Sequence, residues 1–472
     1  MHKVTGEAMY PNYEQNFLQK MPDGTVKQMN PFTGTQVWTV PGRGNRPHTK
    51  KEDANAPQPL PAGEIENICH FCPSNYLKTP PEKARLIRTE NGEFKTLKGV
   101  KCSELSNTIA EFRRVPNLFE IISFDYWEKN YGYVMNEECA AFKDAYLSEA
   151  GGREHVLDVV TTKLKMSGLK KEEIDSISVG RKLKMANSFF AGGHELIIGK
   201  RHFIEGAENS SQKASSGALT PEEHYQFINF TINALKDIYL TNRYVRYVTV
   251  FQNWLNQAGA SFDHLHKQLV AIDGISASNA AEFRMARDNP NMYNDFAVNY
   301  AGYQNLVFAE NDYAVAFADF GHRYPSLAIF SKAEKNQPWN MTPEQVRGMS
   351  DIVHACHASM GSDIPCNEEW YYRPPAVDVA MPWHILIKWR ISNPAGFEAV
   401  TKIFVNTIDP WQLRDKIVPN LFELRKAGKI ASDIKIASEC DCTPNCLRYN
   451  PSLQPPSHTP YAMRGRGTTM DW

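Results

Sequence analysis

The chain has 472 residues, 42% of them apolar, and a formal net charge of −1 at neutral pH. This near-zero charge offers little attraction for nucleic acid or an anionic membrane, so we expect neither as a partner. No apolar run follows Met1, and no stretch of about 18 apolar residues occurs, which argues against secretion and membrane insertion. Nine cysteines, an odd number, suit a reducing compartment, so we expect a cytoplasmic protein.

A polar arm and an extended connection come first in chain order. Residues 1–26 are mostly polar and predict an N-terminal arm, and residues 41–61 are rich in Pro, Gly, Asn and Lys, which is typical of a linker. Arg43 and Arg46 lie at the start of this linker. Guanidinium groups fit phosphate oxygens in pairs, so the two side chains are candidates for a diphosphate clamp, with solvated surface arginines as the alternative.

A cysteine pair, Cys69 and Cys72, follows the linker with the spacing that lets two thiolates reach one tetrahedral zinc ion. Two further ligands are needed. His202 and His264 are the candidates, and His194 is the weaker alternative for the fourth position. A thioredoxin-like redox pair and two buried cysteines of no special role are the competing interpretations. The pair does not open a helix after a strand, which favours zinc.

Apolar runs with β-branched residues predict strands in the next part of the chain. Residues 112–122, 195–198 and 244–253 have this character, and the last run is nearly continuous, as in a buried strand. Between the first two runs, at about residues 125–188, a charged segment with helical spacing predicts an insertion. We expect this insertion to cap a site or to lie in an oligomer interface.

Two similar helix starts indicate an internal repeat. Thr220 and Thr342 are each followed by proline and, at the third helical position, by Glu or Gln, the pattern of a capped helix. Each predicted helix leads to a strand and a histidine, His264 in one case and His384 in the other. A duplicated unit of helix and sheet follows, and chance similarity of two short caps is the alternative.

The segment from Phe251 to Gln268 carries histidines at alternating positions. In an extended chain His264, His266 and Gln268 share one face, because alternate residues of a strand point the same way. A neutral His266 could attack phosphorus with one ring nitrogen while the other donates to a carbonyl, giving a nucleotidyl-histidine. Gln268 could donate to a phosphate oxygen. Small residues just before the histidines would let backbone N–H groups and a hydroxyl approach the same phosphate: Gly259, Ala260 and Ser261. Chance is the competing interpretation of a short pattern in a chain with fourteen histidines.

The last part of the chain holds a second histidine strand and a group of cysteines. His384 follows Pro382, and it either lines the active site or is a core histidine with one hydrogen bond. Three thiols, at Cys440, Cys442 and Cys446, are candidates for a small metal site, with free cysteines on a mobile tail as the alternative. We expect residues 438–472 to form a flexible tail.

Taken in order, several of these segments resemble the galactose-1-phosphate uridylyltransferase family, the transferase branch of the histidine-triad superfamily. The similar segments are those around Arg43 and Arg46, residues 69–82, residues 114–119, residues 251–268 and the second histidine strand, so the resemblance runs through most of the chain. It implies that His264 is a zinc ligand, that His266 is the nucleophile and that the two arginines contact nucleotide phosphates. It also implies a role near the substrate for these residues: Asn117, Asn253, Gly259, Ala260, Ser261 and His384.

The resemblance implies an α+β fold of two histidine-triad-like halves, residues 27–300 and 301–437, each a mostly antiparallel sheet with flanking helices. The implied activity is transfer of a nucleoside monophosphate from a sugar nucleotide to a sugar 1-phosphate, within a homodimer. Leu265 stands where the family usually has proline, and phosphorylases that act on sugar nucleotides or dinucleoside polyphosphates also vary there. A phosphorylase or hydrolase using the same histidine is therefore the alternative, and a non-catalytic zinc-stabilised nucleotide-binding protein is the second. We expect a structural zinc ion and no second metal, because Pro382 has no ligating atom.

Overall fold

The computed structural model describes residues 16–43, 57–60 and 65–453. Within these ranges the strands are β1 (Leu18–Lys20), β2 (Val26–Met29), β3 (Gln36–Thr39), β4 (Ala84–Arg88), β5 (Phe94–Lys98), β6 (Ala110–Pro116), β7 (His194–Gly199), β8 (Tyr247–Trp254), β9 (His266–Ile272), β10 (Val307–Glu310), β11 (Ala314–Asp319), β12 (Ser326–Ser331), β13 (Cys366–Tyr371), β14 (His384–Trp389), β15 (Ile403–Asn406) and β16 (Lys435–Ile436). The α-helices in the same ranges are α1 (Phe124–Tyr131), α2 (Glu137–Ser148), α3 (Ala150–Met166), α4 (Lys171–Ser176), α5 (Val179–Met185), α6 (Asn187–Ala191), α7 (Pro221–Thr241), α8 (Ala277–Asp288), α9 (Tyr300–Tyr303), α10 (Pro343–Met360), α11 (Gly396–Thr401) and α12 (Pro410–Lys426).

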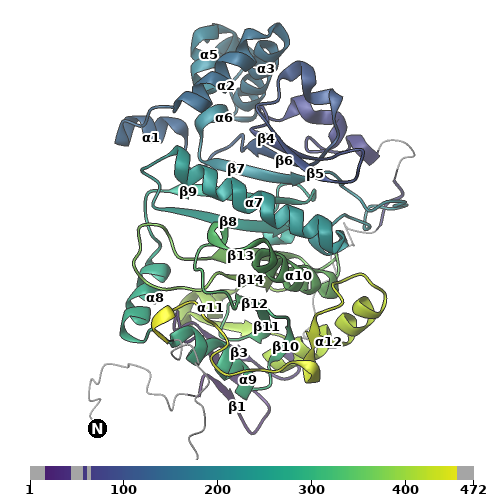
Figure 1. Cartoon of the computed structure of the whole chain (residues 1–472), viewed down its shortest axis with the longest axis vertical. Helices are drawn as coiled ribbons and strands as arrows, with labels where there is room; N and C mark the ends of the chain where they lie inside the picture. The colour runs from purple at the N-terminus through teal and green to yellow at the C-terminus, as the bar shows by residue number, and fades with distance from the viewer. Residues whose placement is uncertain (1–15, 44–56, 61–64, 454–472) are drawn as a thin grey trace, which may run out of the picture.

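Twelve of the described strands form one antiparallel sheet whose order is symmetric about its centre. The order is β5-β4-β6-β7-β9-β8-β13-β14-β12-β11-β10-β16, so β8 and β13 are central neighbours, with β9 and β14 beside them. One long helix precedes the central hairpin of each half, α7 before β8 and α10 before β13. The predicted α+β fold of two halves, each an antiparallel sheet with flanking helices, is confirmed (Figure 1).

Both predicted helix starts are present. The Thr220 hydroxyl accepts from the backbone N–H of Glu223, and the Glu223 carboxylate accepts from the N–H of Thr220. Thr342 and Gln345 make the same reciprocal pair at the start of α10. These bonds satisfy N–H groups that a helix leaves unpaired at its first turn.

The helices α7 and α10 pack beside each other on one face of the large sheet (Figure 1). Helix α7 turns a stripe of apolar residues toward the strands, including Phe227, Ile228 and Leu235, which are fully buried. The ammonium group of Lys267 lies 4.8 Å from the centre of the Phe227 ring, so Lys267 points to the helix-covered face. Side chains alternate along a strand, so the adjacent His266 points to the opposite face.

A fully buried ion pair joins the two halves beneath the helices. Lys267 on β9 lies 2.5 Å from Glu368 on β13, and both side chains are inaccessible to solvent. His357 of α10 and the indole of Trp370 also bond to the Glu368 carboxylate, at 2.8 Å and 2.6 Å. These hydrogen bonds and the lysine compensate the cost of burying the Glu368 charge, and the Lys267 attraction lowers the pKa of this carboxyl against the effect of burial.

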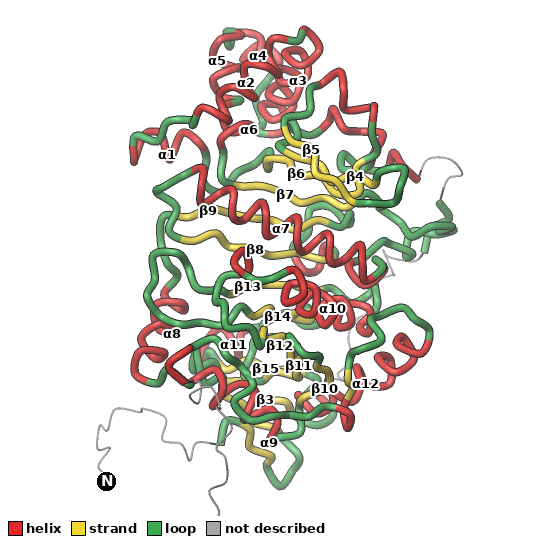
Figure 2. The backbone as a smooth tube through the Cα atoms, in the orientation of Figure 1, coloured by secondary structure: helices red, strands yellow, loops and turns green. Residues whose placement is uncertain are grey.

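The remaining four described strands form a small sheet in the order β1-β2-β3-β15 at the other end of the molecule from helices α1–α6 (Figure 2). The predicted arm extends too far along the chain, because β1 begins at Leu18 and Phe17 is buried against Phe296 and Tyr300. Residues 16–26 are therefore folded, since two adjacent apolar side chains anchor them; residues 1–15 lie outside the described ranges.

The segment between β6 and β7 forms six helices, α1–α6 (Figure 2). They bury their own apolar cluster, which includes Val156, Val160 and Phe190. The expected strand over residues 112–122 is shorter in the structure, since β6 ends at Pro116. Proline has no N–H group to continue the strand's hydrogen bonding, and the chain then turns along residues 117–121.

The segment 438–453 is folded, contrary to the predicted flexible tail. Leu447 and Tyr449 are buried, and the side chain of Asn294 bonds to both the N–H and the carbonyl of Leu447. These two apolar side chains complete the core under the second half. Residues 454–472 lie outside the described ranges. No helix in the described ranges has both the length and the apolar character needed to cross a membrane.

Candidate functional site

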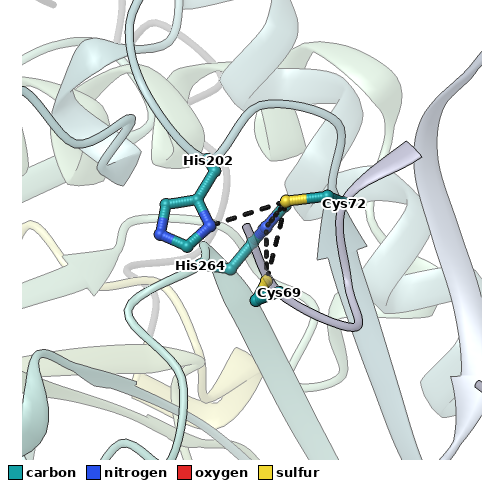
Figure 3. Close-up of side chains that lie close together, drawn as sticks. All are labelled: Cys69, Cys72, His202 and His264. Carbon is teal, nitrogen blue, oxygen red and sulfur yellow. Dashed lines mark hydrogen bonds between the residues drawn. The ribbon is translucent and has the colours of Figure 1, made fainter. Parts of the chain in front are cut away.

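Four predicted metal ligands converge on one point, although they come from three distant segments of the chain. The donor atoms of Cys69, Cys72, His202 and His264 all lie within 4.8 Å of one another (Figure 3). Within the described residues this is the one such group of three or more His, Cys, Asp or Glu side chains. His194 does not belong to it, and neither do Cys440, Cys442 and Cys446.

The spacing of the donor atoms fits a tetrahedral zinc ion. The two sulfur atoms are 3.7 Å apart, and the Nδ1 atom of His264 lies 3.5 Å and 3.8 Å from the sulfurs of Cys69 and Cys72. His202 Nδ1 lies 3.7 Å from the Cys72 sulfur. Zinc bond lengths give tetrahedron edges of about 3.8 Å between sulfurs and about 3.6 Å between sulfur and nitrogen. Two thiolates and two imidazoles could therefore hold a metal such as zinc.

His264 connects this cluster to His266. Its Nε2 donates to the backbone carbonyl of Gly199 at 2.7 Å, which leaves Nδ1 as the ligand atom facing the two cysteines. The backbone carbonyl of His264 accepts from Nδ1 of His266 at 2.8 Å. A metal ion bound to His264 would therefore also fix the start of β9, where His266 lies.

His266 is buried and neutral, with one ring nitrogen free. Burial is the main cause that lowers its pKa to about 4; the backbone hydrogen bond opposes this effect and the nearby His264 ring adds to it. Because Nδ1 carries the proton donated to the His264 carbonyl, Nε2 keeps its lone pair. Within the described residues no hydrogen bond is made to Nε2. The ring of Phe71 packs edge-on against the imidazole and fixes its plane.

A pocket of about 550 Å³ lies at His266 on the face of the sheet away from α7 and α10. Leu196 and Val115 from the sheet and Phe71 form its apolar floor. Phe119 and Ile121 of the loop after β6, and Met166 at the end of α3, line it too, and these three side chains are 45%, 68% and 59% exposed. An apolar slot beside a neutral imidazole suits a flat, weakly polar group such as a nucleobase.

Gln268 lies two residues beyond His266 on the same face of β9 and lines the same pocket. Its Oε1 lies 3.1 Å from Nε2 of His194. Asn117 also lines the pocket, but its amide oxygen accepts from the N–H of Phe119 and its amide nitrogen lies 3.0 Å from the same His194 nitrogen. The side chain of Asn117 is therefore engaged within the pocket wall.

The small-residue loop before the histidines is held by Asn253. The Asn253 side chain accepts from Asn367 at 2.7 Å and donates to the carbonyl of Gly259 at 3.5 Å. Gly259 has a φ of +92°, a conformation that glycine adopts without strain. Ala260 is buried, whereas Ser261 is exposed and lines the pocket. The loop thus brings one hydroxyl to the pocket beside His266.

Asn253, Gly259 and Ala260 do not line this pocket, and neither do Arg43 and His384. Arg43 is exposed and follows β3 of the small sheet, and Arg46 lies outside the described residues. His384 is separated from β9 by β13 and β8, and its ring stacks between the rings of Phe330 and Tyr371 at 4.5 Å and 5.0 Å. Its Nδ1 donates to the carbonyl of Pro382 at 3.0 Å.

Most residues of the pocket had no place assigned to them from sequence, among them Phe71, Met166 and His194. A signal existed for His194, because it is a histidine at the start of an apolar strand run. Phe71 lies inside the Cys69–Cys72 turn and so follows from the metal cluster. Met166 comes from the helical segment, and nothing local relates it to β9.

Comparisons with known proteins agree with this fold. An ADP-glucose phosphorylase from Arabidopsis thaliana, solved with bound ADP-glucose, is similar in structure with a TM-score of 0.54 at 15% sequence identity; the match covers 84% of this chain and 98% of that chain. A GalT-like protein from Arabidopsis thaliana matches with a TM-score of 0.51, also at 15% identity and with the same coverage. The fold is therefore that of the GalT-like proteins, as the resemblance implied.

Among curated proteins no match was found. A family model described as a domain of unknown function, DUF4921, matches residues 21–449, which is most of the chain and includes the metal cluster, His266 and Gln268. The protein belongs to the DUF4921 family.

Proposed function

We propose that this protein is a nucleotidyltransferase that transfers a nucleoside monophosphate through a covalent intermediate on His266. One observation carries the proposal. His266 is a buried, neutral imidazole whose Nδ1 proton is held by the His264 carbonyl and whose Nε2 belongs to a ring lining an apolar pocket beside Gln268. Nucleophilic catalysis requires such a fixed, unprotonated nitrogen.

In the first step Nε2 forms a bond to the α-phosphorus of a sugar nucleotide. The bond from that phosphorus to the bridging oxygen breaks, and the sugar 1-phosphate leaves with the electron pair. The ring gains positive charge as the N–P bond forms, and the Nδ1–H bond to the His264 carbonyl stabilises it. Gln268 and Ser261, which both line the pocket, supply donors for the transferring phosphoryl oxygens.

In the second step a phosphate oxygen of an acceptor attacks the same phosphorus and releases Nε2. A sugar 1-phosphate acceptor makes the protein a transferase, and inorganic phosphate makes it a phosphorylase. Phosphorolysis is the second candidate for two reasons. Leu265 stands where galactose-1-phosphate uridylyltransferases usually have proline, and the chain shares its fold with an ADP-glucose phosphorylase. Both candidates share the first step, so the acceptor separates them.

We assign a structural role to zinc at Cys69, Cys72, His202 and His264. A bound ion would neutralise the charge of the cysteine thiolates and tie β9 to the segment carrying Cys69. None of these four residues lines the pocket at His266. The chemistry is left to His266 and its neighbours on β9.

A homodimer and a cytoplasmic location complete the proposal. Arg43 follows β3 and is exposed, so as a phosphate clamp it would serve the pocket of a second copy. All nine cysteines are described and none is in a disulfide, which supports a reducing compartment. Sedimentation of the purified chain tests the dimer. An Arg43→Ala change should weaken nucleotide binding without dissociating the dimer.

The test of the function is to incubate the protein with donors labelled at the α-phosphorus, UDP-glucose and ADP-glucose, and to trap acid-labile label on the chain. Discharge of the label by galactose 1-phosphate or glucose 1-phosphate supports the transferase. Discharge by inorganic phosphate alone supports the phosphorylase. Binding of both donors without any label would show that the protein is a non-catalytic nucleotide-binding protein.

A further inference from the structure

His194 contacts several parts of the pocket wall at once. It is 2% exposed and lies at the first residue of β7, beside β9. Nδ1 accepts from the backbone N–H of Ile121 at 3.2 Å, and Nε2 lies 3.1 Å from Oε1 of Gln268 and 3.0 Å from Nδ2 of Asn117. The backbone carbonyl of His194 also accepts from the N–H of Asn117 at 2.8 Å.

These partners determine the proton on the ring. A backbone N–H can only donate, so Nδ1 of His194 must be the unprotonated nitrogen. In the neutral ring Nε2 then carries the proton. Of its two neighbours only Oε1 of Gln268 can accept this proton, because Nδ2 of Asn117 is itself a donor. Burial lowers the pKa of His194, which keeps the ring in this neutral form.

The bond also decides which way the Gln268 amide faces. With Oε1 occupied by the His194 proton, the amide nitrogen is the end of Gln268 that remains, and it has no partner within the described part of the chain. An amide rotated by half a turn would present its oxygen to the pocket instead. An oxygen there would repel a phosphate, whereas an N–H group would donate to it.

Resting on the proposed function, we propose that His194 is a positioning residue that holds the Gln268 amide with its N–H groups toward the transferring phosphate. His194 also anchors residues 117–121, the loop that lines the apolar part of the pocket, through its ring at Ile121 and its backbone carbonyl at Asn117. His194 therefore links the pocket wall that would contact the nucleoside to the amide that would contact its phosphate.

The first test is structural and needs no substrate. Crystal structures of the wild-type protein and of His194→Phe, each soaked with AMP, should show the Gln268 amide ordered in the first and rotated or in two orientations in the second. His354→Phe is the matched control, because His354 is another buried histidine but belongs to α10, which covers the other face of the sheet. An unchanged Gln268 amide in His194→Phe overturns the proposal.

The second test asks whether His194 acts through Gln268. The rate of labelling from α-labelled ADP-glucose or UDP-glucose should fall about 100-fold in Gln268→Leu, as on loss of one donor to a developing charge. His194→Phe should cost about 10-fold, the size of one hydrogen bond. The double variant should be no slower than Gln268→Leu, because the His194 bond has nothing left to orient. His194→Gln, whose amide can both accept and donate, should recover most of the rate.

Multiplication of the two effects, to about 1000-fold in the double variant, would show an independent or merely structural role and would overturn the proposal. Thermal melting and bound zinc should match the wild type in His194→Gln, which separates positioning from folding. If no donor labels the wild-type protein while Gln268 still rotates in His194→Phe, the proposed function is wrong and the positioning contact stands.

Discussion

Two histidines hold equivalent places in the two halves, His266 at the first residue of β9 and His384 at the first residue of β14. In each, Nδ1 donates to the carbonyl two residues earlier, at 2.8 Å and 3.0 Å. Burial lowers the pKa of both to about 4. The backbone at the start of each strand thus produces the same neutral tautomer twice.

The two sites differ in what surrounds the ring. His266 lines a pocket and follows His264, whose Nδ1 belongs to the metal cluster. His384 follows Pro382 and is sandwiched by Phe330 and Tyr371, with ring planes within 5° and 9° of parallel. The two rings share the fixed tautomer; the open pocket and the neighbour in the metal cluster distinguish His266.

The largest expected effect separates the two histidines directly. His266→Gly should remove the acid-labile label completely while leaving the bound zinc unchanged, because the nucleophile is lost and the four cluster residues remain. His384→Phe is the matched change in the second half and should keep the label. Autoradiography of the trapped protein and zinc measured by mass spectrometry give both readouts. Label retained in His266→Gly would identify a different nucleophile.

The next prediction tests the metal cluster, which in the described residues belongs to the first half. Cys72→Ser should reduce bound zinc to near zero and lower the free energy of unfolding by several kcal/mol, because metal binding energy is part of folding energy. The rate of labelling should also fall, because β9 is no longer held to the segment carrying Cys69. Cys102→Ser, a half-buried cysteine outside the cluster, is the control for denaturant unfolding and zinc content. Equal stability of the two variants would contradict a structural metal.

A smaller effect sharpens the account of His384 as a buried neutral histidine. Its folded pKa of about 4 is below the usual 6.5, so the unfolded chain binds a proton first as the pH falls. The stability that the neutral ring contributes is present above pH 6.5 and is lost as the pH falls toward 4. Between pH 7 and pH 5 the wild-type protein should lose about 2 kcal/mol more than His384→Phe.

Denaturant unfolding at the two pH values measures this difference. Phe330→Leu removes packing from the same ring but keeps the titrating group, so it should retain the wild-type pH dependence. An identical pH dependence in the wild type and His384→Phe would mean that His384 is protonated equally in the folded and unfolded chains.

The smallest effect concerns the pocket wall that the helical segment contributes to the first half. Met166→Ala should weaken binding of AMP or UMP about fivefold, equivalent to about 1 kcal/mol of lost apolar burial. Val134→Ala, in the same stretch between β6 and β7 and 79% exposed, does not line the pocket and should bind normally. Titration calorimetry gives both constants. Equal affinities would mean that α3 does not contact the nucleoside.

Features set by short stretches of chain could be predicted. The caps at Thr220 and Thr342 depend on bonds within one helical turn. Cys69 and Cys72 share one turn, and the ring of His266 bonds only two residues away. The boundaries of the arm and tail were wrong because Phe17, Leu18, Leu447 and Tyr449 are isolated apolar residues in polar stretches, and only their packing partners decide that they are buried.

The sequence by itself determined the chemistry of the site: two thiols in one turn, alternating histidines and glutamine on one strand, and two capped helices leading to two histidine strands. Local backbone geometry fixes these spacings, whatever the rest of the molecule does. Only the tertiary structure decided that His194 bonds to Gln268, that Met166 reaches the pocket, that Arg43 lies apart and that His384 is enclosed by aromatic rings. Those relations depend on strand register and on helix packing between residues far apart in the chain, which no local spacing encodes.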